Sequence, residues 1–338
     1  MGNKKVNWMF LSIILLHCIV VVALIFLGNS ITFDIIINLI ISELLLILPA
    51  IIFFIGDKGK QKLSVPVSEN IGWEETDNTR VEDSCKISFL QENEISISER
   101  KSTWAQELGF TKIKTGTFFM SIVFTFLIMP MTTVINAISM LFVENTVILM
   151  SEEMLEVPFI LMFSLIALYG PFCEEFVFRG VVYKGYQKEG STIGAILLSG
   201  LLFGLVHMNF NQAGYAFFIG IALAFLVELS GSIWPAVICH VIFNAQSVTL
   251  LYVYDRFFPE LMEAEAAAVT VDGLLMTISV YGVVAAISTA IAICVGVWIG
   301  KNEGRSISLQ WNWREEKKRF TVPLFIAIGI SLIYMILW

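Results

Sequence analysis

The sequence predicts an all-α protein, a polytopic bundle of about eight or nine transmembrane helices, and two observations carry this prediction. Of the 338 residues, 57% are hydrophobic and only 15% are charged, whereas ordinary soluble chains are about 25% charged. The apolar residues also gather into long runs, and a helix needs about 20 of them to cross a bilayer. The net charge of −8 argues against a nucleic-acid partner, which requires a basic face.

Nine apolar runs are candidate spans. The first follows Lys4 and Lys5 as a signal peptide would, but no small-residue cleavage site follows it, so we expect a retained anchor. The nine runs are Trp8–Leu27, Phe33–Ile55, Thr115–Val143, Val157–Gln187, Thr192–Met208, Ala213–Leu229, Ser232–Tyr252, Gly273–Gly300 and Phe320–Trp338.

The runs divide the chain into an N-terminal two-span hairpin (1–55), a polar cytoplasmic loop (56–114) and a membrane core (115–338). Near the end of the loop, the stretch from Ser102 to Phe110 has cap-like residues followed by apolar ones at helical spacing, so a short interfacial helix is possible there. The weak periodicity favours the alternative, a linker that lies along the membrane.

The basic residues predict the orientation. With the N-terminus inside the cell, 19 of the 21 lysines and arginines fall on the cytoplasmic face, while the outer loops are acidic. This bias follows the positive-inside rule, so we expect a multi-pass membrane protein with its N-terminus inside. The location that we expect is a bacterial cytoplasmic membrane.

Three clusters of polar residues interrupt apolar spans, where ionisable side chains are costly and usually mark function. The first contains Glu174, Glu175 and Arg179. Glu175 and Arg179 are four residues apart, so they share a helix face and can pair, which leaves Glu174 free. Pro171, just before them, predicts a bend in the helix.

The second cluster is Phe203-x-x-x-His207, and the third places His240 and Asn244 on one helix face. With a rise of about 1.5 Å per residue, Glu174 and His207 lie about 20 and 22 Å from the cytoplasmic ends of their helices, and His240 and Asn244 about 12 and 18 Å. The three clusters can therefore meet inside the membrane.

These residue types suit hydrolysis of an acyl bond. Glu174 and His207 could hold and deprotonate a water, and His240 with Asn244 could donate hydrogen bonds to the developing oxyanion. A second possibility is a catalytic zinc site with Glu174, His207 and His240 as ligands.

The ordered motifs Glu-Glu-x-x-x-Arg, Phe-x-x-x-His and His-x-x-x-Asn resemble those of the CPBP intramembrane proteases, also called CAAX type II prenyl endopeptidases or abortive-infection proteins. The likeness covers about residues 155–252. It implies a conical cavity open to the cytosol, Glu174 and His207 as activators of the water, and His240 with Asn244 as the oxyanion hole. Glu175 and Arg179 would support the site.

The resemblance also implies an endopeptidase that cuts a membrane-associated substrate, either CAAX-like or related to bacteriocin maturation and immunity. It favours a glutamate-dependent reaction without a cofactor, although older descriptions of the family invoke a metal. Two alternatives stay open: a non-catalytic immunity or scaffold protein on the same fold, and a transporter, for which the chain lacks an inverted repeat.

Two further features predict contacts between helices. His17 and Glu43 have similar depths on adjacent spans, so a hydrogen bond between them is a possible pairing. Gly200 and Gly204 form a small-x-x-x-small pattern, which predicts close approach of their helix to a neighbour.

Overall fold

The structure is a computed structural model that describes residues 2–26, 35–63, 103–260, 270–306, 309 and 319–337. Over these residues the secondary structure is helical, and no strand occurs among them. The helical segments are α1 (Asn3–Phe26), α2 (Ile35–Leu63), α4 (Trp104–Glu107), α5 (Thr115–Ser139), α6 (Thr146–Leu155), α7 (Phe159–Met162), η1 (Phe163–Tyr169), α8 (Gly170–Glu175), η2 (Phe176–Tyr183), α9 (Lys184–Gln187), α10 (Thr192–Val206), α11 (Phe210–Ser230), α12 (Trp234–Phe257), α14 (Val271–Asn302) and α16 (Val322–Leu337).

The predicted fold class is confirmed, with a smaller number of full-length spans. Within the described ranges, seven helices are long and apolar enough to cross a membrane. The remaining two predicted spans correspond to α10 and α16, which have only 15 and 16 residues. Helix α10 is short because the chain turns after His207, where Met208 has a φ of 51°, and Asn209 then caps α11 by accepting from the Gln212 amide.

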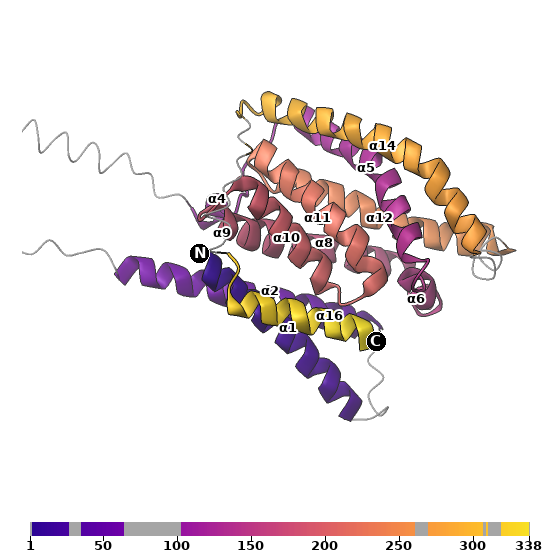
Figure 1. The fold of residues 1–338 in the computed structure, drawn as a ribbon, viewed down its shortest axis with the longest axis horizontal. Coiled ribbons are helices and arrows are strands. Elements are labelled where there is room, and N and C mark those ends of the chain that lie inside the picture. The colour runs from indigo at the N-terminus through magenta and orange to yellow at the C-terminus, as the bar shows by residue number, and fades with distance from the viewer. Residues whose placement is uncertain are drawn as a thin grey trace, which may run out of the picture.

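The helices pack in three groups (Figure 1). Helices α5 and α14 lie side by side on one face, α1, α2 and α16 form the opposite face, and α8, α10, α11 and α12 lie between them. Both outer groups expose many large apolar side chains, as expected for surfaces that face lipid.

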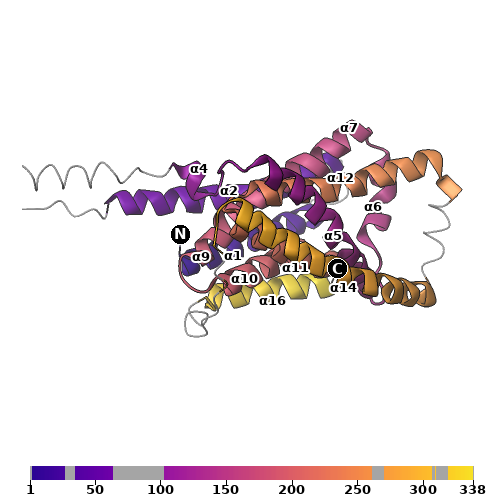
Figure 2. The ribbon, with the colours of Figure 1, turned by 90° about the horizontal axis from the view of Figure 1, so that it is seen from above.

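Several polar contacts gather distant segments at one end of the bundle. The Asn3 side chain donates to the Glu189 carbonyl (2.8 Å), and the buried Arg319 donates to the Tyr186 carbonyl (2.9 Å). The N-terminus, α4 and α9 lie at this same end (Figures 1 and 2). Lys4 and Lys5 of α1 and Lys184 of α9, which the sequence assigns to one membrane face, thus belong to segments at this end, while the orientation of the protein in the membrane stays a prediction.

The short helix that the sequence allows near the end of the loop is a single turn, α4. A capping box between Thr103 and Gln106 begins it, and Trp104 is exposed while Leu108, four residues later, is buried. Ser102 and most of the 56–114 loop lie outside the described residues.

The span that carries the two glutamates is a continuous helical run from Phe159 to Gln187, but its pitch changes twice. The π-helical segment η1 precedes α8, and a second one, η2, follows it. Pro171 is the second residue of α8, inside this continuous run, where its missing N–H interrupts the backbone hydrogen bonds of the helix. The irregularity predicted from Pro171 thus takes the form of π-helical turns, which are frequent at functional sites.

Helices α10 and α11 approach each other through glycines. A Cβ atom placed on Gly220 would lie 2.7 Å from the Gly200 Cα, and one on Gly204 would lie 2.7 Å from the Ala213 carbonyl oxygen. Close packing predicted from Gly200 and Gly204 is therefore confirmed.

This contact makes Gly220 a sensitive position. We expect Gly220→Ala to destabilise the protein by about 1–3 kcal/mol, because the added methyl group meets backbone atoms of α10 that cannot move aside locally. Gly282→Ala on α14 is the matched control, since outside the adjacent backbone of α14 no atom of the described residues lies within 4 Å of the position that its methyl group would take. Thermal unfolding in detergent compares the two; equal midpoints would contradict the prediction.

Candidate active site

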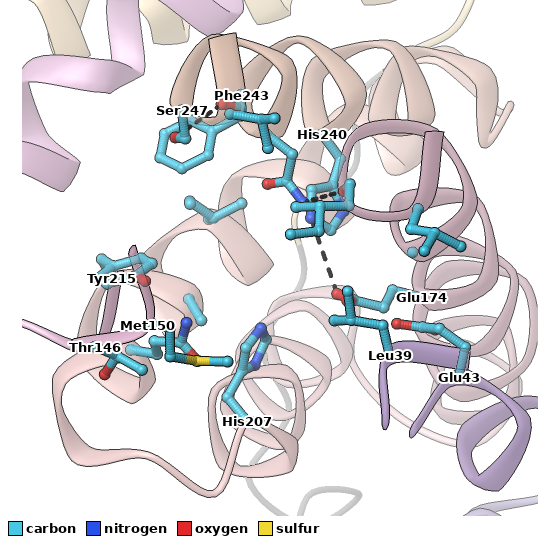
Figure 3. A pocket seen from close by; sticks show the side chains of 18 of the residues that line it. Leu39, Glu43, Thr146, Met150, Glu174, His207, Tyr215, His240, Phe243 and Ser247 are labelled. Carbon is cyan, nitrogen blue, oxygen red and sulfur yellow. Dashed lines mark hydrogen bonds and ion pairs between the residues drawn. The ribbon is translucent and has the colours of Figure 1, made fainter. Parts of the chain in front are cut away.

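The four residues expected to carry the chemistry line one cavity of about 270 Å³. Glu174 comes from α8, His207 from the end of α10, and His240 and Asn244 from α12. Figure 3 shows Glu174, His207 and His240 facing this space from three sides. The depths of these residues along their helices allowed them to meet, and in the structure they do line one cavity.

Glu174 presents its carboxylate to the cavity. Its side chain is 16% exposed, and Oε2 lies 3.9 Å from Nε2 of His240. The same Oε2 atom is buried and lacks a hydrogen-bond partner in the described structure. A carboxylate oxygen left without a donor at a cavity is well placed to accept a hydrogen bond from a water or a substrate.

His207 has a defined tautomer. Its Nδ1 lies 2.7 Å from the Phe203 carbonyl oxygen, and because a carbonyl only accepts, Nδ1 carries the hydrogen. In the neutral ring, Nε2 is then the nitrogen with a free lone pair. Figure 3 shows the ring across the cavity from Glu174, so this nitrogen is available as a proton acceptor.

Glu175 joins two of the predicted residues. Its Oε1 lies 3.0 Å from Nη1 of Arg179 and 2.9 Å from Nδ1 of His240. The Glu175–Arg179 pair predicted from the sequence spacing is thus present and completely buried. Glu175 also orients His240: it accepts a hydrogen bond from Nδ1–H of that ring, which leaves Nε2 of His240 directed toward Glu174.

Asn244 is also oriented by a backbone group. Its Nδ2 donates to the Ile166 carbonyl on η1 (2.9 Å), which fixes the amide orientation because the carbonyl only accepts. An amide nitrogen has two hydrogens, so one donor remains beside the cavity that Asn244 lines.

Two residues of the site were not assigned to it from the sequence. Phe203 is buried, and its ring lies 5.1 Å from that of His207 and 5.6 Å from that of His240, with the Arg179 Cζ 4.4 Å from its centroid. Glu43 on α2 lines the same cavity as Glu174. In the sequence, Glu43 stands out as a carboxylate inside an apolar run. The sequence suggests His17 as its partner because the two residues lie at similar depths.

The possible His17–Glu43 hydrogen bond is not formed. The Nδ1 atom of His17 bonds instead to the Ile13 carbonyl (2.9 Å), one turn earlier in its own helix. Both residues line a larger cavity of about 770 Å³, and Glu43 points toward Glu174.

A zinc ion would need at least three ligands at one point. Among the described residues, no three His, Cys, Asp or Glu side chains are grouped closely enough to hold a metal. Glu174 and His240 are neighbours, but His207 lies across the cavity. The set Glu174, His207 and His240 does not fit a metal site in this arrangement.

The long apolar helices indicate an integral, multi-pass membrane protein, and the cavity lined by residues of the three motifs lies within its helix bundle. Residues 156–246 match the family described as Type II CAAX prenyl endopeptidase Rce1-like. This segment contains all three motifs, so the resemblance inferred from them is confirmed.

A known relative matches part of the chain. The chain is similar to "Putative membrane peptidase YdiL" of Bacillus subtilis (strain 168), with 28% identity over 84 residues, which is 25% of this chain and 34% of that protein. The chain thus matches only about a third of the length of this curated relative. No solved structure matches the chain significantly.

Proposed function

We propose that this protein is an intramembrane endopeptidase that hydrolyses a peptide bond of a membrane-associated substrate. One observation carries the proposal: a carboxylate without a partner and an imidazole with a free ring nitrogen, Glu174 and His207, face each other across a cavity inside the membrane. The family match over the same residues supports it.

In the proposed reaction, a water held between Glu174 and His207 attacks the scissile carbonyl carbon while one of the two residues takes its proton. The carbonyl oxygen gains negative charge, and Asn244 Nδ2–H donates to it. His240 Nε2 donates as well when its ring is protonated, since Nδ1–H is held by Glu175. The C–N bond then breaks, and the proton passes from the base to the leaving amine.

Glu175, Arg179 and Phe203 act as positioning residues in this scheme. The carboxylate of Glu175 orients the His240 ring, Arg179 neutralises that carboxylate, and Phe203 separates the two imidazoles. We propose a reaction without a metal, because the side chains alone supply a base and oxyanion donors. The proposed setting is a bacterial cytoplasmic membrane with the N-terminus inside, and the substrate is CAAX-like or a bacteriocin-related peptide.

The test is a cleavage assay with purified protein in liposomes and a pool of lipid-anchored, fluorescence-quenched peptides. We expect His207→Ala to lower kcat/KM by about 10²-fold or more, as for loss of a general base, and a chelator to leave the wild-type rate unchanged. Wild-type activity in His207→Ala would overturn the proposed base. Inhibition by the chelator that added zinc reverses would overturn the metal-free reaction.

A further inference from the structure

We infer that Glu43 selects substrates with a lysine or arginine close to the scissile bond, by pairing its carboxylate with that cation. This inference rests on the proposed endopeptidase function and names its substrate class. Glu43 belongs to α2, in the N-terminal hairpin, outside the segment that matches the family.

The packing of α2 against α8 places Glu43 beside the proposed water-activating carboxylate. A Cβ on Gly170 would lie 3.4 Å from the Glu43 Oε1, so this carboxylate lies directly against α8 at Gly170. Glu174 is four residues after Gly170, on the same helix face. Figure 3 shows Glu43 and Glu174 next to each other at one wall of the cavity, and both line it.

One carboxylate oxygen of Glu43 has no hydrogen-bond donor among the described residues. This atom, Oε2, is buried. A buried carboxylate without a counter-charge is costly, and intramembrane ionisable residues usually mark a substrate path. Arg179 does not serve as the counter-charge, because it is held between Glu175 and the Gly220 carbonyl.

The space next to Glu43 favours a positive charge. The site cavity adjoins the larger cavity, and Glu43 and Glu174 line both. Glu144 also lines the larger one, whereas no lysine or arginine is among the described residues that line either cavity. Low-dielectric walls focus this negative potential, so these carboxylates stabilise a cation that an occupant brings into the cavity. Lysine and arginine side chains supply one on a long apolar stem.

The experiment uses the liposome assay with peptide sets that differ only in one residue near the scissile bond, which is lysine, methionine or glutamate. For the wild type we expect kcat/KM to be about tenfold or more higher for the lysine peptide than for the methionine peptide, as for a desolvated charge pair. Glu43→Gln should bring this ratio close to one, and Glu43→Lys should favour the glutamate peptide. Glu153→Gln, an exposed carboxylate on α6, is the matched control and should keep the ratio.

Binding gives a second readout that needs no turnover. The His207→Ala protein should bind the lysine peptide more tightly than the methionine peptide, and adding Glu43→Gln should remove the difference. Cleavage without a lysine preference, or a preference that survives Glu43→Gln in a folded protein, would overturn this inference and leave the endopeptidase proposal standing. Failure of the wild type to cleave any peptide would overturn both.

Discussion

Replacing Glu174 with glutamine is expected to lower kcat/KM by about 10³-fold or more, the largest effect on activity that the site predicts. The amide has the same shape as the carboxylate but cannot take a proton from water. The Oε2 atom faces the cavity and has no partner within the described structure, so the substitution breaks no hydrogen bond to that atom, and the fold should be kept.

The measurement is the liposome cleavage assay, with the unfolding midpoint of each variant as a check on folding. Glu153→Gln removes a carboxylate from an exposed position of α6 and should retain wild-type activity. A folded Glu174→Gln protein that cleaves at the wild-type rate would rule out a catalytic function for this carboxylate. It would favour a non-catalytic protein on the same fold.

The largest effect on stability is expected for Arg179→Met, with a loss of about 3–5 kcal/mol. The guanidinium is completely buried, lies 3.0 Å from Glu175 Oε1, and donates to the Gly220 carbonyl at 3.3 Å. Removing it leaves the Glu175 carboxylate charged and without its cation in the core of the bundle. His240 would also lose its fixed orientation, so activity should fall with stability.

A double variant shows how much of the stability loss comes from the unpaired charge and how much from the change in side-chain volume. Arg179→Met combined with Glu175→Gln should recover part of the stability, because it removes both charges of the buried pair. The control is Lys5→Met, since Lys5 pairs with Asp57 while its side chain is 44% exposed, and such pairs contribute about 1 kcal/mol or less. Thermal unfolding in detergent measures all three; a double variant no more stable than Arg179→Met would contradict this account.

Sequence spacing predicted the contacts that lie within one helix and the depths of residues on different helices. The Glu175–Arg179 pair follows from a four-residue separation, and the close contact at Gly200 from the absence of side chains. Spacing could not predict the rotation of each helix about its axis. For this reason the hydrogen bond from His240 to Glu175 and the approach of Glu43 to Glu174 emerge only from the packed bundle.

Because spacing does not give the rotation of a helix, it also could not show that His17 and Glu43 do not pair. His17 and Glu43 were matched on depth, but His17 satisfies its ring nitrogen on the Ile13 carbonyl of its own helix. The shortness of α10 was likewise hidden, because the apolar run continues to Met208 while the backbone turns there. Catalytic function remains a prediction for each of the site residues.

The ring of Phe203 couples the residues around it, which affects how the site can change during evolution. One buried ring contacts His207, His240 and the Arg179 guanidinium, so a substitution at any of these four positions alters the surroundings of the other three. Their effects should therefore be non-additive. Single substitutions at these positions should therefore lose activity unless a second substitution compensates, which makes a change of reaction difficult to evolve stepwise. Glu43 belongs to a different helix, α2, and is not one of these four residues, so we expect it to vary more independently, and specificity can then diverge while the reaction stays the same.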